Sequence, residues 1–222
     1  MQKIWNACAL MLLMSSTMAH AETLYQVEII AFARDSAEAE NEENWDKHYN
    51  LRYPERSVNL QSSNSSDTAG SNSSFQLLSA DAMQLNKEAD VIAGRRNMRV
   101  LLHQAWRQTV DDPARATAVL IDGGKQFGVH HELEGTFTLS VEHFLRADAN
   151  LWLSRFSSNA GVDAQVLPIP PGASDDAGDA HYAVTQTVVL QEQRRMRSGE
   201  LHYFDHPLIG LLVLVTPMPA AQ

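Results

Sequence analysis

The sequence predicts an α+β domain in which one main helix packs on a mostly antiparallel sheet of about six to seven strands. Several segments alternate apolar and polar residues, as half-buried strands do, whereas one segment has the spacing of an amphipathic helix. Two stretches, residues 36–75 and 157–180, are rich in polar and turn-forming residues and predict long surface loops.

Residues 1–21 have the pattern of a cleavable secretory signal. Lys3 precedes an apolar run over residues 7–14, and Ala19-His20-Ala21 fits an A-x-A cleavage site. The run is shorter than the roughly 20 apolar residues that span a bilayer, and a helical membrane anchor is the alternative interpretation. We expect export into a soluble compartment, a mature chain that begins at Glu22, and no membrane insertion of that chain.

The composition restricts which partners the chain is expected to bind and which covalent bonds can stabilise it. Cys8 is the only cysteine and lies in the predicted signal, so the mature chain has neither a thiol nor a disulfide. The formal net charge of -10 argues against nucleic acid or an anionic membrane as the main partner, because both require clustered cations. We expect a single domain over residues 22–222 that is held by its hydrophobic core.

The first strand is predicted over residues 25–32, where Tyr25, Val27 and Ile29 alternate with Gln26 and Glu28. The loop over residues 36–75 follows, first acidic and then rich in serine and asparagine. Such a segment buries too little apolar surface to offset the entropy of ordering it, so its Ser/Asn part is expected to be mobile.

A helix is predicted from Ser79 to Gly94. Ser79 is a suitable N-cap, Leu78 can pack against Met83, and Gly94 is a natural stop. The alternation over residues 98–106 predicts a second strand directly after the helix. The order strand, helix, strand suggests that these two strands are parallel neighbours joined by a right-handed crossover.

The second half of the chain predicts further strands. Residues 133–141 alternate strictly, which indicates one buried and one wet face, and a turn at 146–148 is expected to join them to a strand over 151–153 in a hairpin. Arg197-Ser198-Gly199 is typical of a hairpin turn and lies between predicted strands at 184–196 and 200–205. The apolar run 211–215 predicts a central strand that is covered on both faces.

Catalytic motifs are not evident in the sequence. It contains no G-x-S-x-G or S-x-x-K motif, and acid pairs such as Asp111-Asp112 lie in predicted turns, so we expect neither an enzyme nor a cofactor. His202 and His206, with Glu200 and Asp205 beside them, offer a loosely spaced set of metal ligands. A metal-dependent hydrolase that uses this set is an alternative, although we expect no metal.

The densest cation group lies at Arg194, Arg195 and Arg197. Guanidinium groups bind carboxylates bidentately, but the side chains of Arg194 and Arg195 point to opposite faces of a strand unless it bulges or ends there. The alternative is a charged hairpin tip that keeps an edge strand soluble. Two aromatic residues, Tyr203 and Trp106, can either stack on sugar rings or pack in the core.

Three blocks of the sequence resemble a known family. They are residues 25–32 (YQVEIIAF), 99–108 (RVLLHQAWRQ), and the segment from 195–203 (RMRSGELHY) through Asp205-His206-Pro207 to Val215-Thr216-Pro217. Together they look like the CsiV family of peptidoglycan-binding proteins. The resemblance covers both ends of the mature chain and leaves out the two loops.

The resemblance implies a Gram-negative periplasmic protein of cell-shape integrity. Such a protein binds peptidoglycan and assists the outer-membrane lipoprotein activator of a bifunctional penicillin-binding protein. An adaptor that binds only a protein partner, through a sheet edge or the loop at 35–74, is the alternative function. The family supplies no site residues, so the candidate ligand-binding set comes from the residues themselves: Arg194, Arg195, Arg197, His202, Tyr203, Asp205, His206 and Trp106.

Overall fold

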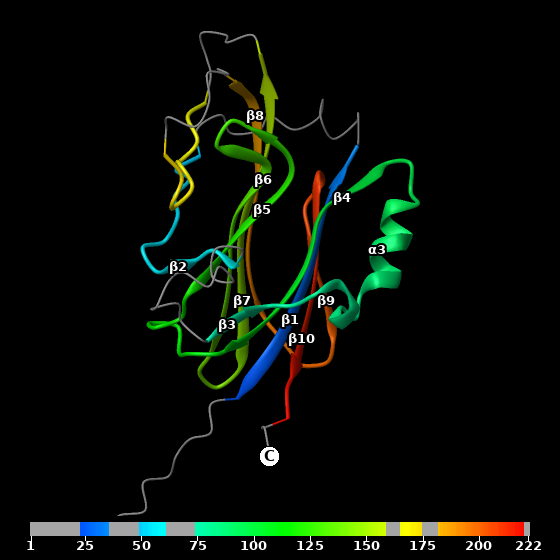
Figure 1. Cartoon of the computed structure of the whole chain (residues 1–222), viewed down its shortest axis with the longest axis vertical. Coiled ribbons are helices and arrows are strands. Elements are labelled where there is room, and N and C mark those ends of the chain that lie inside the picture. The colour runs from blue at the N-terminus through cyan, green and yellow to red at the C-terminus, as the bar shows by residue number, and fades with distance from the viewer. Residues whose placement is uncertain (1–22, 36–48, 61–73, 159–164, 175–181, 220–222) are drawn as a thin grey trace, which may run out of the picture.

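The structure is a computed structural model that describes residues 23–35, 49–60, 74–158, 165–174 and 182–219. Two five-stranded sheets face each other (Figure 1). Sheet A has the order β3-β4-β1-β10-β9, formed by Phe75–Leu77, Met98–Thr109, Leu24–Arg34, Ile209–Pro217 and Leu201–Asp205. Sheet B has the order β2-β5-β6-β7-β8, formed by Ser57–Val58, Ala118–Phe127, His130–Val141, Leu145–Ser157 and Ala183–Arg195.

The chain is therefore strand-rich and mostly antiparallel, as expected, but the predicted number of strands is wrong. The described residues form ten strands, and they lie in two sheets instead of one. Neighbouring strands are antiparallel except for β2 and β5, which pair in parallel through Ser57 and Ala118. The predicted signal and large parts of the two predicted loops lie outside the described residues.

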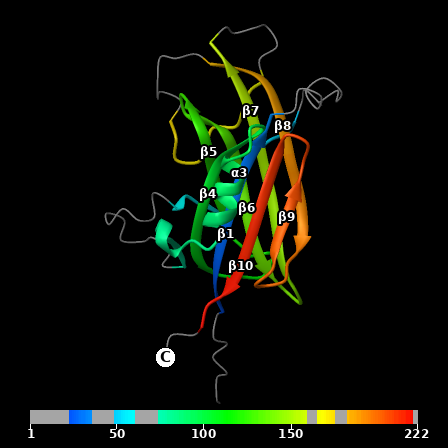
Figure 2. The same cartoon turned by 90° about the vertical axis from the view of Figure 1, so that its right-hand side faces the viewer.

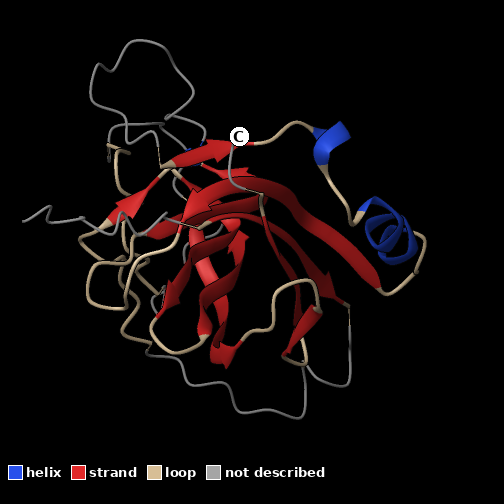
Figure 3. Ribbon diagram, turned by 90° about the horizontal axis from the view of Figure 1, so that it is seen from below, coloured by secondary structure: helices blue, strands red, loops and turns tan. Residues whose placement is uncertain are grey.

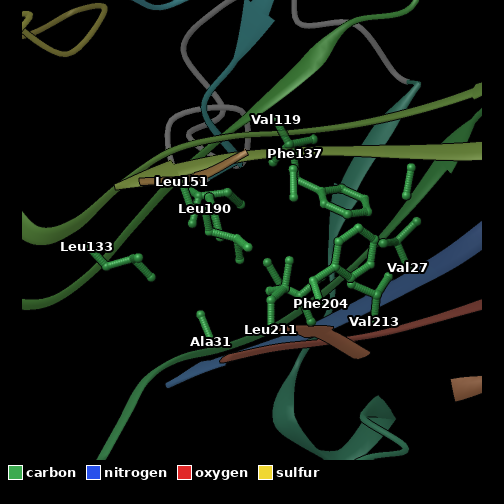
Figure 4. Packing of buried hydrophobic residues seen from close by; sticks show 14 of the residues in the cluster. Val27, Ala31, Val119, Leu133, Phe137, Leu151, Leu190, Phe204, Leu211 and Val213 are labelled. Atoms are coloured by element: carbon green, nitrogen blue, oxygen red, sulfur yellow. The ribbon is translucent and has the colours of Figure 1, made fainter. Parts of the chain in front are cut away.

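The main core lies between the two sheets. Alternate residues of β1 point into it, and in β10 Leu211, Val213 and Val215 do the same. Figure 4 shows side chains from both sheets meeting in this layer: Val27, Ala31, Phe204, Leu211 and Val213 from sheet A, and Val119, Leu133, Phe137, Leu151 and Leu190 from sheet B. Because the opposite faces of β1 and β10 are also covered, the continuous apolar run at 211–215 forms an interior strand, as predicted.

A helix covers the outer face of sheet A. The α-helix α3 (Asn86–Ala93) packs Ile92 on Ile30 and Phe32, and it ends at Gly94, as predicted. The 3-10 helix η1 (Ala80–Ala82) lies before it, and the two lie together at one side of the molecule (Figure 3). The predicted start at Ser79 is wrong, because the chain between η1 and α3 is extended.

Glu28 explains where α3 begins. Its buried carboxylate accepts the backbone N–H groups of Gln84 at 2.7 Å and Leu85 at 2.8 Å, and His103 Nε2 lies 2.7 Å from the same carboxylate. A helix N-terminus has backbone N–H groups without intrahelical partners, and an acidic side chain satisfies them. A buried acid on β1 thus holds the two residues that immediately precede α3, more than fifty residues later in the chain.

The first and second predicted strands are neighbours but run antiparallel. Val27 lies opposite Trp106, and the N–H of Asp35 donates to the carbonyl of Asn97 at 2.9 Å. The chain that follows α3 therefore enters β4 beside the end of β1 and runs back along it. The predicted parallel crossover is wrong for this reason.

Of the two predicted hairpins, the structure confirms one and contradicts the other. Strands β6 and β7 form the first one, although the turn lies at residues 142–144 and not at 146–148. The second is wrong, since β8 pairs with β7 in sheet B and β9 pairs with β10 in sheet A. Met196 is buried in the core and its N–H donates to Leu145, so residues 196–200 carry the chain from one sheet to the other (Figure 2).

Candidate functional site

A cavity of the described structure lies on the outer face of sheet B. Its volume is about 370 Å³, within the range of about 300 to 1,000 Å³ that is typical of ligand pockets. Two segments outside the main strands, residues 49–60 and 165–174, lie over the sheet and complete its walls. We call it the sheet B cavity; it is lined by Tyr53, Asn59, Leu120, Ile121, Asp122, Val129, His131, Glu134 and residues 170–173.

Glu134 is the most deeply buried polar residue of the cavity, with 1% of its surface exposed. It faces outward from the sheet because Leu133 and Phe137 of the same strand face the core. Its carboxylate accepts the backbone N–H of His131 at 3.2 Å and the indole N–H of Trp152 at 3.3 Å. These bonds fix the carboxylate in position at the cavity wall.

Asp122 and Tyr53 add two further polar groups. Asp122 is the cross-strand partner of Glu134 on β5. Burial raises the pKa of Asp122, the nearby Glu134 charge raises it further, and His131 opposes both effects. The pKa of Tyr53 is raised far above its ordinary value by burial and then by the charges of Glu134 and Asp122, so its phenol keeps its proton at neutral pH.

Aromatic contacts hold the covering segments on the sheet. The ring of Tyr53 meets that of Trp152 edge to face at 5.1 Å, and Leu167 packs in the same cluster. Next to it, Phe127 stacks on Phe156 at 4.6 Å and meets Tyr182 edge to face at 5.2 Å. Such contacts are worth about 0.5 to 1.5 kcal/mol each beyond burial, so the contact of Tyr53 with Trp152 stabilises the cover at residues 49–60.

The lining determines which groups the cavity can bind. It offers carboxylate acceptors at Asp122 and Glu134, a phenol donor at Tyr53 and an amide at Asn59, and its described residues include neither lysine nor arginine. Acceptors of this kind suit hydroxyl, amide N–H and ammonium groups. The cavity is thus suited to neutral or cationic polar ligands with some apolar surface.

The raised pKa of Asp122 predicts a pH-dependent stability. The folded protein holds this proton more tightly than the unfolded chain, whose reference pKa is 3.8. Stability from this group is therefore greatest below pH 3.8, decreases as the pH rises through the folded pKa, and stays low at neutral pH. Asp122→Asn should raise the midpoint of thermal unfolding at pH 7, and this gain should disappear below pH 3.8. An equal gain at both pH values would contradict the assignment.

The three predicted arginines do not form one patch. Arg194 donates to Glu192 and, at 2.6 Å, to the carbonyl of Tyr203, and its guanidinium lies 5.0 Å from the ring of Phe204. Arg195 points to the other face and lies over the ring of Phe144. Arg197, with a side chain that is 78% exposed, pairs with Glu200 at 3.6 Å. Each guanidinium therefore has its own partner.

The predicted residues that follow, from Tyr203 to His206, form a network with Arg34 on sheet A. The Tyr203 hydroxyl donates to Asp205 at 2.6 Å, and Arg34 pairs with the same carboxylate at 2.8 Å. Arg34 also donates to the carbonyl of His206 at 3.2 Å. His202 accepts the backbone N–H of Arg197 through Nε2 at 3.1 Å. Tyr203, Asp205 and His206 are thus brought together, with Arg34 as a partner that the sequence analysis did not include.

Trp106 lies in the core and not at the surface. Its exposed fraction is 0%, its indole N–H donates to Gln108 at 2.7 Å, and its ring meets that of Phe137 edge to face at 5.9 Å. Of the two roles considered for this residue, the structure therefore shows core packing. A glycan cannot reach the ring without opening the sandwich.

The main residues of the sheet B cavity were not predicted from the sequence. The alternation of residues 133–141 predicted one wet face, but on that face Glu134, Thr136 and Ser140 are buried. Tyr53 lies inside the stretch predicted as a loop. One signal was available: Trp152 and Phe156 alternate with core residues of β7, so the outer face of sheet B carries large apolar side chains that require a cover.

No group of three or more His, Cys, Asp or Glu side chains is placed to hold a metal ion in the described ranges. The helices of the same ranges include none whose length and apolar character would let it cross a membrane.

Comparison with known proteins gives one match. A family model described as "Peptidoglycan-binding protein, CsiV" matches residues 5–218, which is nearly the whole chain. Searches of curated proteins and of solved structures found no match. The matched range includes both sheets, the sheet B cavity and all of the candidate residues on β8 and β9.

Proposed function

Since the chain belongs to the CsiV family of peptidoglycan-binding proteins, we propose that it binds peptidoglycan directly, without altering it chemically, through the sheet B cavity. The observation that carries this proposal is the combination of a ligand-sized cavity with a fixed acceptor at Glu134, a second carboxyl group at Asp122 and a protonated phenol at Tyr53. The family description supports wall binding, and the lining supports this cavity as its place.

The chemistry of the polymer matches the lining. Peptidoglycan consists of amino sugars with hydroxyl and acetamido groups, crosslinked by short peptides with amide and amino groups. These donors are complementary to the carboxylates of Asp122 and Glu134, and the apolar faces of sugar rings suit a wall that contains Leu120 and Pro170. Several such bonds within one enclosed site would give binding that varies little with salt concentration.

The wider role that we propose follows from the family. In the periplasm of a Gram-negative cell, after export by a cleavable signal, the protein supports wall synthesis and cell shape by assisting the outer-membrane lipoprotein activator of a bifunctional penicillin-binding protein. Wall binding would keep the protein at the polymer on which that synthase acts. A protein adaptor that does not bind the wall is the alternative, and co-sedimentation with peptidoglycan distinguishes these two functions.

Co-sedimentation with isolated peptidoglycan sacculi tests the proposal. The chain from Glu22 onward should pellet with sacculi, and Asp122→Asn and Tyr53→Phe should each weaken binding about tenfold, because one lost hydrogen bond costs roughly 1.4 kcal/mol. Asp148→Asn is a matched control, since Asp148 lies on sheet B away from the cavity lining and bonds to Gln193. This control should bind like the wild type.

The three arginines Arg194, Arg195 and Arg197 remain a second candidate for the wall contact. If the triple variant Arg194→Ala, Arg195→Ala, Arg197→Ala abolishes pelleting while the cavity variants retain it, and if salt weakens the binding, the contact lies at those cations and not in the cavity. Failure of the wild type to pellet would refute direct wall binding and favour the adaptor.

A further inference from the structure

The two acidic side chains of the sheet B cavity lie side by side. Asp122 on β5 and Glu134 on β6 are directly opposite each other in the antiparallel pairing of these strands. Both face away from the main core, because their neighbours Ile121 and Leu133 are buried between the two sheets. Two carboxylates at cross-strand positions repel each other, so this pair favours the approach of a positive charge.

The two carboxyl groups differ in their partners. Glu134 accepts the backbone N–H of His131 and the indole N–H of Trp152, and Nδ1 of His130 lies 3.2 Å from both of its oxygens. Asp122, in contrast, forms no hydrogen bond or ion pair with any residue that the structure describes. A ligand donor therefore finds its free acceptor at Asp122.

Little positive charge is available inside the cavity to balance Asp122. The described lining contains neither lysine nor arginine, and the titratable group that its cover contributes is the phenol of Tyr53, which keeps its proton. His131 is the group of this lining that can become positively charged. Burial raises the pKa of Asp122, and the net shift stays upward although His131 opposes it. A cationic ligand would supply the charge that the lining lacks and would favour the ionised form of Asp122.

The remaining lining indicates which cation fits. A primary ammonium group offers three donors, so it can bond to Asp122 and still reach a second acceptor, such as the phenol oxygen of Tyr53. The alkyl stem that carries such a group can pack on the apolar surface of Leu120 and Pro170. The cavity therefore suits an alkylammonium side chain.

We propose that the sheet B cavity binds the alkylammonium group of a diamino acid and that Asp122 selects this group over a neutral amide. The inference rests on the proposed wall binding, since the stem peptides of Gram-negative peptidoglycan contain a diamino acid. The side-chain amine of that residue is free in an uncrosslinked stem and becomes an amide when the stem is crosslinked through it. The cavity therefore binds uncrosslinked stems in preference to crosslinked ones.

Co-sedimentation with native and N-acetylated sacculi tests the inference. Acetylation converts the free amines of the stems into neutral amides. The chain from Glu22 onward should bind native sacculi at least about tenfold more tightly than acetylated ones, because acetylation removes the charge-assisted hydrogen bond. Asp122→Asn should bind the two preparations nearly equally, since the amide keeps the shape of the side chain and removes its charge.

Asp148→Asn is the matched control, because it removes the same charge from sheet B outside the cavity lining. This variant should keep the wild-type preference for native sacculi. A preference that persists unchanged in Asp122→Asn would overturn the inference, since the difference would then reflect the overall charge of the polymer.

Two further outcomes separate this inference from the proposed function. Equal binding of native and acetylated sacculi by the wild type would overturn the inference alone and leave wall binding standing. Failure to pellet with either preparation would refute the proposed function and the stem-peptide source. If Nα-acetyl-L-lysinamide, which carries the same alkylammonium group, then bound in calorimetric titration, the cavity would be assigned to a lysine of a protein partner.

Discussion

Gly135→Ala is expected to lower the free energy of unfolding by about 3 kcal/mol, because strain and overpacking act at the same residue. The φ angle of Gly135 is +138°, a conformation that residues with a side chain rarely adopt. A Cβ atom there would overlap the carbonyl oxygen of Asn150 and lie 2.8 Å from the Cα of Leu151. Both atoms belong to the backbone of β7, so relief requires the strand to move.

Gly128→Ala separates the two causes. Gly128 also has a positive φ, of +64°, but a Cβ atom there would meet no atom within 4 Å. Its replacement should therefore cost only the conformational part, about 1 kcal/mol. Denaturant unfolding of both variants measures the difference. If Gly135→Ala and Gly128→Ala lowered the free energy of unfolding equally, β7 would be able to move at Asn150. The pairing that places Glu134 beside Trp152 would then be less rigid than the structure indicates.

The strands that the sequence predicts well are those in which buried and less buried residues alternate along the strand. Residues 25–32 and 98–106 alternate because their faces meet different layers, and both are strands in the structure. Strand β5 was not predicted, because Gly123 and Gly124 interrupt its alternation. These glycines serve tertiary contacts: a Cβ on Gly123 would lie 2.7 Å from the carbonyl oxygen of Leu101, so the absence of a side chain lets β5 approach β4.

The assignment of strands to sheets could not be predicted from local pattern. Arg197-Ser198-Gly199 has the composition of a hairpin turn, and its Gly199 has a φ of +79°. The strands on either side nevertheless enter different sheets, since Met196 is drawn into the core beside Leu145. The residues of the turn determine that the chain changes direction. The burial of Met196 is what accompanies the pairing of the next strand with sheet A instead of with β8.

The candidate site was harder to predict for a related reason. Glu134 alternates with core residues, so its pattern is that of a solvated face, and only the cover by residues 49–60 and 165–174 turns that face into a cavity. The cover comes from segments with no periodic signal. The side chains of β8 and β9 could be placed as neighbours in sequence, but the partners that Arg194 and Asp205 take depend on the assignment of the two strands to different sheets.

Trp106→Ala should have the largest effect of the core substitutions, a loss of about 3 to 5 kcal/mol of unfolding free energy. The indole is fully buried between the sheets, next to Phe137, and the cavity that it leaves cannot collapse without moving β4. Chemical denaturation measures this loss. A variant destabilised to that extent cannot report on ligand binding, so a milder replacement is needed to test the role of Trp106.

Trp106→Phe supplies that test. Phenylalanine keeps an aromatic contact with Phe137 but removes the indole N–H, which leaves the side-chain oxygen of the buried Gln108 without its donor and costs about 1 to 3 kcal/mol. Because the ring does not reach the surface, sacculus binding per folded molecule should equal that of the wild type. If this variant folds with wild-type stability and yet loses binding, Trp106 contacts the polymer in a state where the two sheets have separated, and the cavity on sheet B is not the whole site.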